Sequence, residues 1–293
     1  MRLRALAKIN LGLDVIRKRE DGYHDVRMVM QTIQMYDVLE MYRRRVPGIS
    51  LETNLPYVPC DERNLVYKAA KLLIDEFGIH EGVAMKLDKT IPVAAGMAGG
   101  SSDAAAALVG MNRLFSLGLS MEDLMQRGAQ IGADVPYCVM RGTALAEGIG
   151  EKLTRIAQTP KCYVLVGKPG INVSTKVAYE NLKLQEIQRH PDIDGLIEAI
   201  KKGDLHTMAS KMENVFEPGI IEKYPVIQDI KDVMEREGAL KAMMSGSGPS
   251  VFGIFESRAV MDHAAAVLRR SGLARMVFAT EVHNQYEGDT NDK

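Results

Sequence analysis

The sequence of 293 residues has almost no net charge, no closely spaced cysteines and no long apolar run. Its 37 basic residues nearly balance its 38 acidic ones, so the composition favours neither nucleic acid nor an anionic membrane as a partner. Cys60, Cys138 and Cys162 form no C-x-x-C pair, which argues against a metal cluster and a disulfide framework. No segment is long and apolar enough to span a bilayer or to serve as the core of a signal peptide. We therefore expect a cytoplasmic protein.

The length of the chain favours two domains, because it exceeds what one hydrophobic core usually organises. In the first half, apolar and polar residues alternate over Val83–Lys89, which predicts a strand. A helix is predicted over Asn64–Gly78, with Asn64 as its N-terminal cap and Gly78 at its end. A further helix is expected to start at Ser120 and to end near Gly132.

The second half predicts the order strand, several helices, strand, strand, helix and strand. Its first strand is expected at Lys161–Val166 and its last at Ala274–Val282. One of its helices is predicted to begin at Asp204 and to carry an apolar face that continues to Val215. This order is typical of a ferredoxin-like split β-α-β unit. We place the domain boundary around Thr154–Pro160.

A glycine-rich segment, PVAAGMAGGSSDAAAAL (Pro92–Leu108), runs directly into an alanine-rich helix. The start of a helix leaves backbone N–H groups unpaired, and phosphates bind there. Glycines let the backbone approach phosphate oxygens closely. No Gly-Lys-Ser/Thr follows and the spacing is not G-x-G-x-x-G, so neither a Walker A loop nor a dinucleotide fingerprint is present. We call residues 92–102 the first glycine loop; a tight turn before a buried helix remains the alternative.

Four other segments carry candidate polar groups. SGSGPS, which we call the second glycine loop (Ser245–Ser250), is either a hairpin turn or a second phosphate contact. Asp134 in GADVPYCV is either a helix cap or a base with a cation beside it. Lys8 in AKINLGLDV lies next to an apolar run and is by itself unremarkable. In DGYHD (Asp21–Asp25), an aromatic side chain and a histidine follow a turn, and they are either ordinary surface residues or a face that stacks on and hydrogen-bonds to a flat ring.

The segments AKINLGL, PVAAGMAGGSSDAAAAL, GADVP and SGSGPS resemble, in order and spacing, those of the GHMP kinase family over nearly the whole chain. The resemblance implies an α+β fold with two domains. Residues 1–156 would form an ATP-binding domain like domain 2 of ribosomal protein S5, and residues 157–293 a ferredoxin-like domain. It implies an ATP-dependent kinase for a small alcohol. We expect Mg²⁺ as its cofactor, because phosphoryl transfer from ATP normally needs it, and we expect a monomer or weak dimer.

The DGYH segment is the specific part of this resemblance. It implies that the acceptor is the 2-hydroxyl of 4-diphosphocytidyl-2-C-methyl-D-erythritol, in the non-mevalonate isoprenoid precursor pathway. Lys8 and Asp134 would be the catalytic pair. The residues implied to bind the acceptor are Asn10, which would fix the sugar alcohol, and Tyr23 and His24, which would contact cytosine. Thr175 and Tyr179 would supply the hydroxyl and the second stacking aromatic ring of the cytidine pocket.

The resemblance also assigns residues to ATP. These are Asn64, Lys89, Pro92, Val93, Ala94, Ala95, Gly96, Met97, Ala98, Gly99, Gly100, Ser101 and Ser102, with Ser245, Gly246, Ser247 and Gly248 as candidates in the second glycine loop. Phosphoryl transfer from ATP normally needs Mg²⁺, for which no carboxylate pair stands out and Ser102 is the candidate ligand. Ala98 stands where the family often has glycine, although alanine does not take a positive φ freely. Another kinase of the family and a non-catalytic nucleotide-binding regulator remain alternatives.

Overall fold

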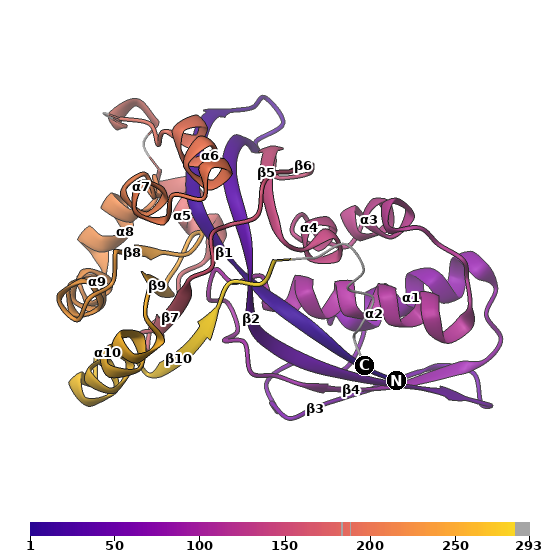
Figure 1. Cartoon of the computed structure of the whole chain (residues 1–293). Helices are drawn as coiled ribbons and strands as arrows, with labels where there is room; N and C mark the ends of the chain where they lie inside the picture. Colours follow the sequence, from indigo (N-terminus) through magenta and orange to yellow (C-terminus); the bar gives the residue numbers. More distant parts are fainter. Residues whose placement is uncertain (183, 188, 285–293) are drawn as a thin grey trace.

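The computed structural model describes residues 1–182, 184–187 and 189–284, and it contains two sheets (Figure 1). The first sheet has six strands in the order β3-β4-β2-β5-β6, and β1 pairs with β2. Its strands are β1 (Arg2–Lys18), β2 (His24–Arg44), β3 (Ile49–Thr53), β4 (Gly82–Asp88), β5 (Thr143–Gly148) and β6 (Lys152–Arg155). Within the described residues, no helix combines the length and apolarity that crossing a membrane requires.

The first sheet is contacted by three helices of the first half of the chain, α1 (Leu65–Phe77), α2 (Gly99–Phe115) and α4 (Val135–Met140) (Figure 1). The fourth helix of this half, α3 (Met121–Ala129), packs against α4 and α2. The side chain of Asn64 caps α1 by accepting a hydrogen bond from the Val66 backbone, and Gly78 ends the helix with φ +60°. The prediction for this helix is therefore confirmed. Ser120 starts α3 with a reciprocal capping box, but the helix ends at Ala129, before the predicted end.

The second sheet has four strands in the order β10-β7-β9-β8. They are β7 (Tyr163–Lys168), β8 (Lys241–Met244), β9 (Val251–Phe255) and β10 (Met276–Glu281). The chain between β7 and β8 contains α5 (Thr175–Asn181), the 3₁₀ turn η1 (Leu184–Glu186), α6 (Ile193–Lys202), α7 (Leu205–Ser210), α8 (Glu217–Lys223) and α9 (Val226–Arg236), and α10 (Arg258–Ser271) joins β9 to β10. The split β-α-β order predicted from the sequence is confirmed.

The helix predicted from Asp204 is shorter than its apolar pattern indicated. Asp204 does cap it, but α7 ends at Ser210, so the prediction that it continues to Val215 is wrong. The backbone of Leu13 donates a hydrogen bond to the carbonyl of Glu213, and the Leu13 carbonyl accepts one from Val215. Pairing with β1 therefore draws these residues out of the helix.

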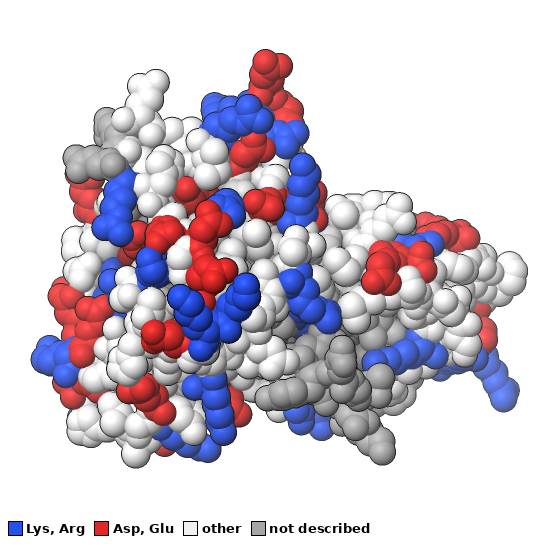
Figure 2. All heavy atoms as spheres, turned by 45° about the horizontal axis from the view of Figure 1, so that its top comes forward, with Lys and Arg blue, Asp and Glu red and all other residues white. Residues whose placement is uncertain are grey.

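The long strands β1 and β2 connect the two halves of the molecule. β2 contacts β10, and Ile33 forms an isolated bridge with Val282. The last strand of the first sheet ends at Arg155 and the first strand of the second begins at Tyr163. The domain limits of 1–156 and 157–293 stay a prediction, and residues 285–293 lie outside the described part. Basic and acidic side chains are interspersed over the face in Figure 2, in keeping with the net charge of −1.

Candidate active site

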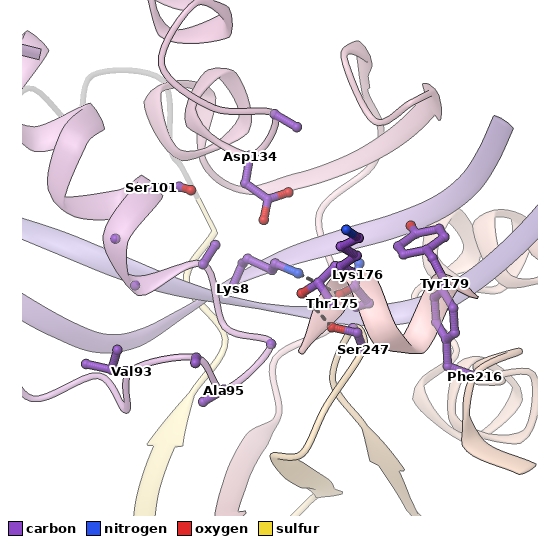
Figure 3. Close-up of a pocket in the computed structure, with 18 of the residues that line it drawn as sticks. Lys8, Val93, Ala95, Ser101, Asp134, Thr175, Lys176, Tyr179, Phe216 and Ser247 are labelled. Carbon is purple, nitrogen blue, oxygen red and sulfur yellow. Dashed lines mark hydrogen bonds between the residues drawn. The ribbon is translucent and has the colours of Figure 1, made fainter. Parts of the chain in front are cut away.

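A cavity of about 1390 Å³ lies where the two halves of the molecule meet, and most of the predicted site residues line it. They come from β1, the first glycine loop, the start of α4, α5 and the second glycine loop (Figure 3). The predicted site residues that line the cavity are Lys8, Asn10, Tyr23, His24, Asn64, Lys89, Pro92, Val93, Ala94, Ala95, Gly96, Ala98, Gly99, Gly100, Ser101, Asp134, Thr175, Tyr179, Gly246 and Ser247. Met97, Ser102, Ser245 and Gly248 do not line it.

The two glycine loops contact each other directly. Gly96 has φ +74°, and a Cβ atom added there would lie 2.1 Å from the carbonyl oxygen of Ser245. The Ser245 hydroxyl donates a hydrogen bond of 2.9 Å to the Gly96 carbonyl. Only glycine fits this approach, so Gly96 and Ser245 hold the two walls of the cavity together.

The first glycine loop also contains two alanines in the left-handed region. Ala94 has φ +52° and Ala98 has φ +54°. This conformation costs an L-residue about 1–2 kcal/mol. Ala98 therefore adopts the left-handed conformation even though it stands where the family often has glycine. Strain of this kind persists when surrounding structure fixes it, and it is common at ligand-binding loops.

The N-terminus of α2 faces the cavity without a side-chain cap. Ala98 occupies the cap position and makes no capping hydrogen bond, while Gly99, Gly100 and Ser101 of the first turn line the cavity. The unpaired N–H groups and the positive end of the helix dipole form an anion-binding site. The 17-residue helix therefore presents a suitable position for a phosphate.

Ser102 and Met97 point away from this site. The Ser102 hydroxyl donates a hydrogen bond of 2.6 Å to the carbonyl of Leu6, and the residue is 2% exposed. The backbone N–H of Lys8 donates to the Met97 carbonyl, and the Met97 side chain is buried. Ser102 thus fastens α2 to β1, and the structure does not place it where a metal ion bound to ATP could reach it.

Lys8 and Asp134 face the same part of the cavity (Figure 3). Register shifts in the β1–β2 pairing flank Lys8 and Asn10, and such bulges re-aim side chains. The buried Lys8 ammonium donates a hydrogen bond of 2.7 Å to Asn10 Oδ1. Asp134 lies at the N-terminal cap position of α4 but makes no capping bond, so the alternative of a helix cap is wrong.

The expected ion pair between Lys8 and Asp134 is not formed: among the described residues, the partner of the ammonium is Asn10. Asn10 is fully buried, and its amide nitrogen contacts Met28 Sδ at 3.2 Å. Both polar ends of Asn10 are therefore engaged within the protein. This arrangement fits positioning of Lys8 better than direct binding of a sugar alcohol.

Three aromatic rings form a cluster at the other end of the cavity. The rings of His24 and Tyr179 are 5.1 Å apart, and those of Tyr179 and Phe216 are 4.8 Å apart with edge-to-face geometry. Burial raises the pKa of Tyr179 to about 12, and the negative charge of Asp134 adds to this shift. Tyr23 lines the cavity but is 61% exposed, so His24 rather than Tyr23 lies against Tyr179.

The second glycine loop is also held by hydrogen bonds from α5 and from Asn214. The hydroxyls of Thr175 and Ser247 are 2.9 Å apart and joined by a hydrogen bond, which ties α5 to the loop. The buried amide of Asn214 donates hydrogen bonds of 2.8 Å to the carbonyls of Met244 and Gly246. Asn214 and Phe216 were missed in the sequence, where no local motif distinguishes them.

The side chains of Asn64 and Lys89 are already engaged. Asn64 caps α1 and donates to the carbonyl of Pro59. The Lys89 ammonium contacts Asp37 and lies 2.6 Å from Asp103. Burial lowers the pKa of Lys89, but Asp103 and Asp37 together raise it above its usual value. Its charge is therefore neutralised locally, and it braces the wall of the cavity.

Comparison with known proteins agrees with this geometry. Residues 64–142 match the model of the GHMP kinases N terminal domain, and residues 196–273 match that of the GHMP kinases C terminal domain. The 4-diphosphocytidyl-2-C-methyl-D-erythritol kinase of Lachnospira eligens is 57% identical over 96% of this chain and 98% of its own length. The kinase of the same name from Clostridium perfringens strain 13 is 47% identical over 97% of this chain and 99% of its own length.

Solved structures show the same architecture. A crystal structure of 4-(cytidine 5'-diphospho)-2C-methyl-D-erythritol kinase has a TM-score of 0.84 and 30% identity, over 97% of this chain and 100% of that chain. Homoserine kinase from Cytophaga hutchinsonii has a TM-score of 0.80 at 20% identity, over 97% of this chain and 95% of that chain, which shows a shared fold. The chain belongs to the GHMP kinase family.

Proposed function

We propose that this chain transfers the γ-phosphoryl group of ATP to the 2-hydroxyl of 4-diphosphocytidyl-2-C-methyl-D-erythritol. The products are ADP and the 2-phosphate, an intermediate of the non-mevalonate isoprenoid pathway. The observation that carries the proposal is that three features line one cavity. They are the uncapped N-terminus of α2, the side chains of Lys8 and Asp134, and the cluster of His24, Tyr179 and Phe216. A kinase for a small aliphatic alcohol would leave the aromatic cluster without a ligand.

In this proposal Asp134 is the general base. The acceptor oxygen is a tertiary alcohol and becomes a good nucleophile only as its proton leaves. A kinase aspartate commonly accepts that proton, and it must lie within hydrogen-bond reach. The Lys8 ammonium, held by Asn10, offsets negative charge that develops on the transferred phosphoryl group. Asn10 acts through Lys8 as a positioning residue.

ATP is proposed to bind with its phosphates at the first turn of α2 and along the first glycine loop. Mg²⁺ usually binds through phosphates, waters and one or two protein ligands. Among the described residues, no group of three His, Cys, Asp or Glu side chains could hold a metal ion. The Ser101 hydroxyl lines the cavity and is the ligand that fits Mg²⁺ carried by ATP. When bound, Mg²⁺ would neutralise charge on the phosphates.

We further propose that the enzyme works in the cytoplasm as a monomer or weak dimer. The three cysteines are unpaired, and the exposed thiol of Cys60 suits a reducing compartment. All the groups assigned to the reaction come from one chain, so the site is complete without a second copy. Sedimentation at micromolar concentration tests the oligomeric state.

A coupled ADP-release assay tests the reaction. We expect Mg²⁺-dependent turnover with 4-diphosphocytidyl-2-C-methyl-D-erythritol, and only background rates with homoserine and mevalonate at equal concentration. Phosphorus NMR of the product should show a new phosphomonoester without coupling to a carbinol proton, because the tertiary carbon carries none. Faster turnover of homoserine or mevalonate, or phosphorylation at a primary or secondary hydroxyl, would refute the proposal.

A further inference from the structure

The positive charges around the cavity are unequally available for a ligand. The basic side chains that line it are Lys8, Lys18, Arg63, Lys89 and Lys176. Lys8 is held by an amide oxygen, Lys89 by two carboxylates and Arg63 by a neighbouring aspartate at 2.7 Å. Within the described part of the chain, Lys18 and Lys176 donate no hydrogen bond to another residue, which leaves their ammonium groups available to a bound anion.

Lys176 lies between the two ends of the proposed acceptor site. It follows Thr175, which is anchored to the second glycine loop, and precedes Tyr179 by three residues on α5. Residues three apart on a helix are neighbours on its surface. Figure 3 shows the Lys176 side chain between the Lys8–Asp134 pair and the ring of Tyr179, and all of these residues line the cavity.

The Lys176 ammonium is also free to move toward a ligand. Its side chain is 82% exposed, and its ion-pair partner Glu180 lies 3.8 Å away, beyond hydrogen-bond distance. A long exposed side chain keeps its charge at little desolvation cost. Lys18 is less suitable as the partner of this anion. It lies opposite His24 in the β1–β2 register, and therefore at the aromatic end of the cavity.

The chemistry of the acceptor supplies a partner for this charge. Its cytosine and its reacting hydroxyl are joined by a diphosphate, which is anionic at neutral pH. With cytosine at Tyr179 and the hydroxyl at Asp134, the diphosphate passes Lys176. We propose that Lys176 binds this diphosphate and thereby selects nucleotide-linked acceptors over nucleosides. The inference rests on the proposed function and adds a residue to its acceptor site.

Binding of two cytidine probes tests the inference without turnover. Cytidine has the base and ribose, and cytidine diphosphate adds the diphosphate. Calorimetric titration without ATP should show that Lys176→Met weakens cytidine diphosphate by about tenfold, or about 1.4 kcal/mol, and leaves cytidine unchanged. Lys176→Arg should retain most of the affinity. Lys202→Met, which removes an exposed lysine on α6 away from the cavity, is the matched control and should change neither.

Equal weakening of both probes by Lys176→Met would indicate a structural role, and no weakening of either would exclude contact; both results overturn the inference.

Steady-state kinetics distinguish a role in binding the acceptor from a role in the chemical step. We expect Lys176→Met to raise the acceptor KM about tenfold with kcat and the ATP KM unchanged, and Glu180→Gln not to raise the acceptor KM. A fall in kcat alone would place Lys176 at the transferred phosphoryl group and refute the diphosphate role. Absence of turnover in the wild type would instead refute the proposed function.

Discussion

Replacement of Asp134 by asparagine removes one negative charge from the cavity and keeps the shape of the side chain. The Asp134 carboxylate is partly exposed and caps no helix, and within the described residues it forms no hydrogen bond or ion pair. The native state therefore loses no protein contact. We expect the free energy of unfolding to change by no more than about 0.5 kcal/mol, as for a substitution away from structural features.

The effect on the chemical step should be large. Loss of a general base typically slows a reaction by about 10²–10⁴-fold, which corresponds to about 2.7–5.4 kcal/mol of activation free energy. Single-turnover quench-flow with Asp134→Asn and both substrates saturating measures this step without product release. Both substrates should still bind, because their phosphate and aromatic contacts are unchanged.

A second aspartate provides the opposite pattern. Asp204 caps α7, and its carboxylate accepts a hydrogen bond from the backbone of Thr207 at 2.9 Å. Asp204→Ala should cost about 1 kcal/mol of stability and leave the single-turnover rate unchanged. A rate for Asp134→Asn within a few-fold of the wild type would remove Asp134 from the chemistry and leave catalysis by positioning alone.

Features determined by neighbouring residues could be predicted from the sequence. Asn64, Gly78 and Ser120 set helix ends, because capping needs only the residue itself and the next few backbone groups. The first glycine loop and α2 were predicted for the same reason: glycines and alanines in sequence encode a turn followed by a close-packed helix. The left-handed backbone at Ala98 shows the limit, since local preference opposes what the fold imposes.

Features that join distant segments could not be predicted in this way. Lys89 and Asp37 are 52 residues apart in the chain, and nothing local to either residue indicates that they pair. Phe216 reaches Tyr179 only because the residues just before it pair with β1 instead of continuing α7. The apolar spacing from Asp204 onward fits a longer helix, and tertiary pairing overrides it. Resemblance to a family assigned roles at the site, but it did not reveal which side chains the protein already holds.

Three further predictions follow from contacts in the cavity. Gly96→Ala should lower the melting temperature by several degrees, because a Cβ atom would meet a carbonyl oxygen of the second glycine loop at 2.1 Å, whereas Gly100→Ala, with its nearest atom at 3.7 Å, should not; equal melting temperatures would contradict the loop contact. Burial lowers the pKa of His24 below 6.5, so the unfolded chain binds its proton first as the pH falls. The stability contribution of neutral His24 is therefore complete above about pH 6.5 and declines below it, and urea unfolding from pH 8 to pH 5 should show a shallower decline for His24→Gln. The aromatic cluster gives the last prediction. Stacking of a base on an aromatic ring is worth about 1–3 kcal/mol, so Tyr179→Leu should raise the acceptor KM by about 5- to 150-fold and leave the ATP KM unchanged. Tyr23→Leu is the matched control, because Tyr23 is 61% exposed and contacts no aromatic ring among the described residues, and its effect should be smaller. A larger increase for Tyr23→Leu than for Tyr179→Leu in steady-state kinetics would move the cytosine from the inner cluster to the rim of the cavity.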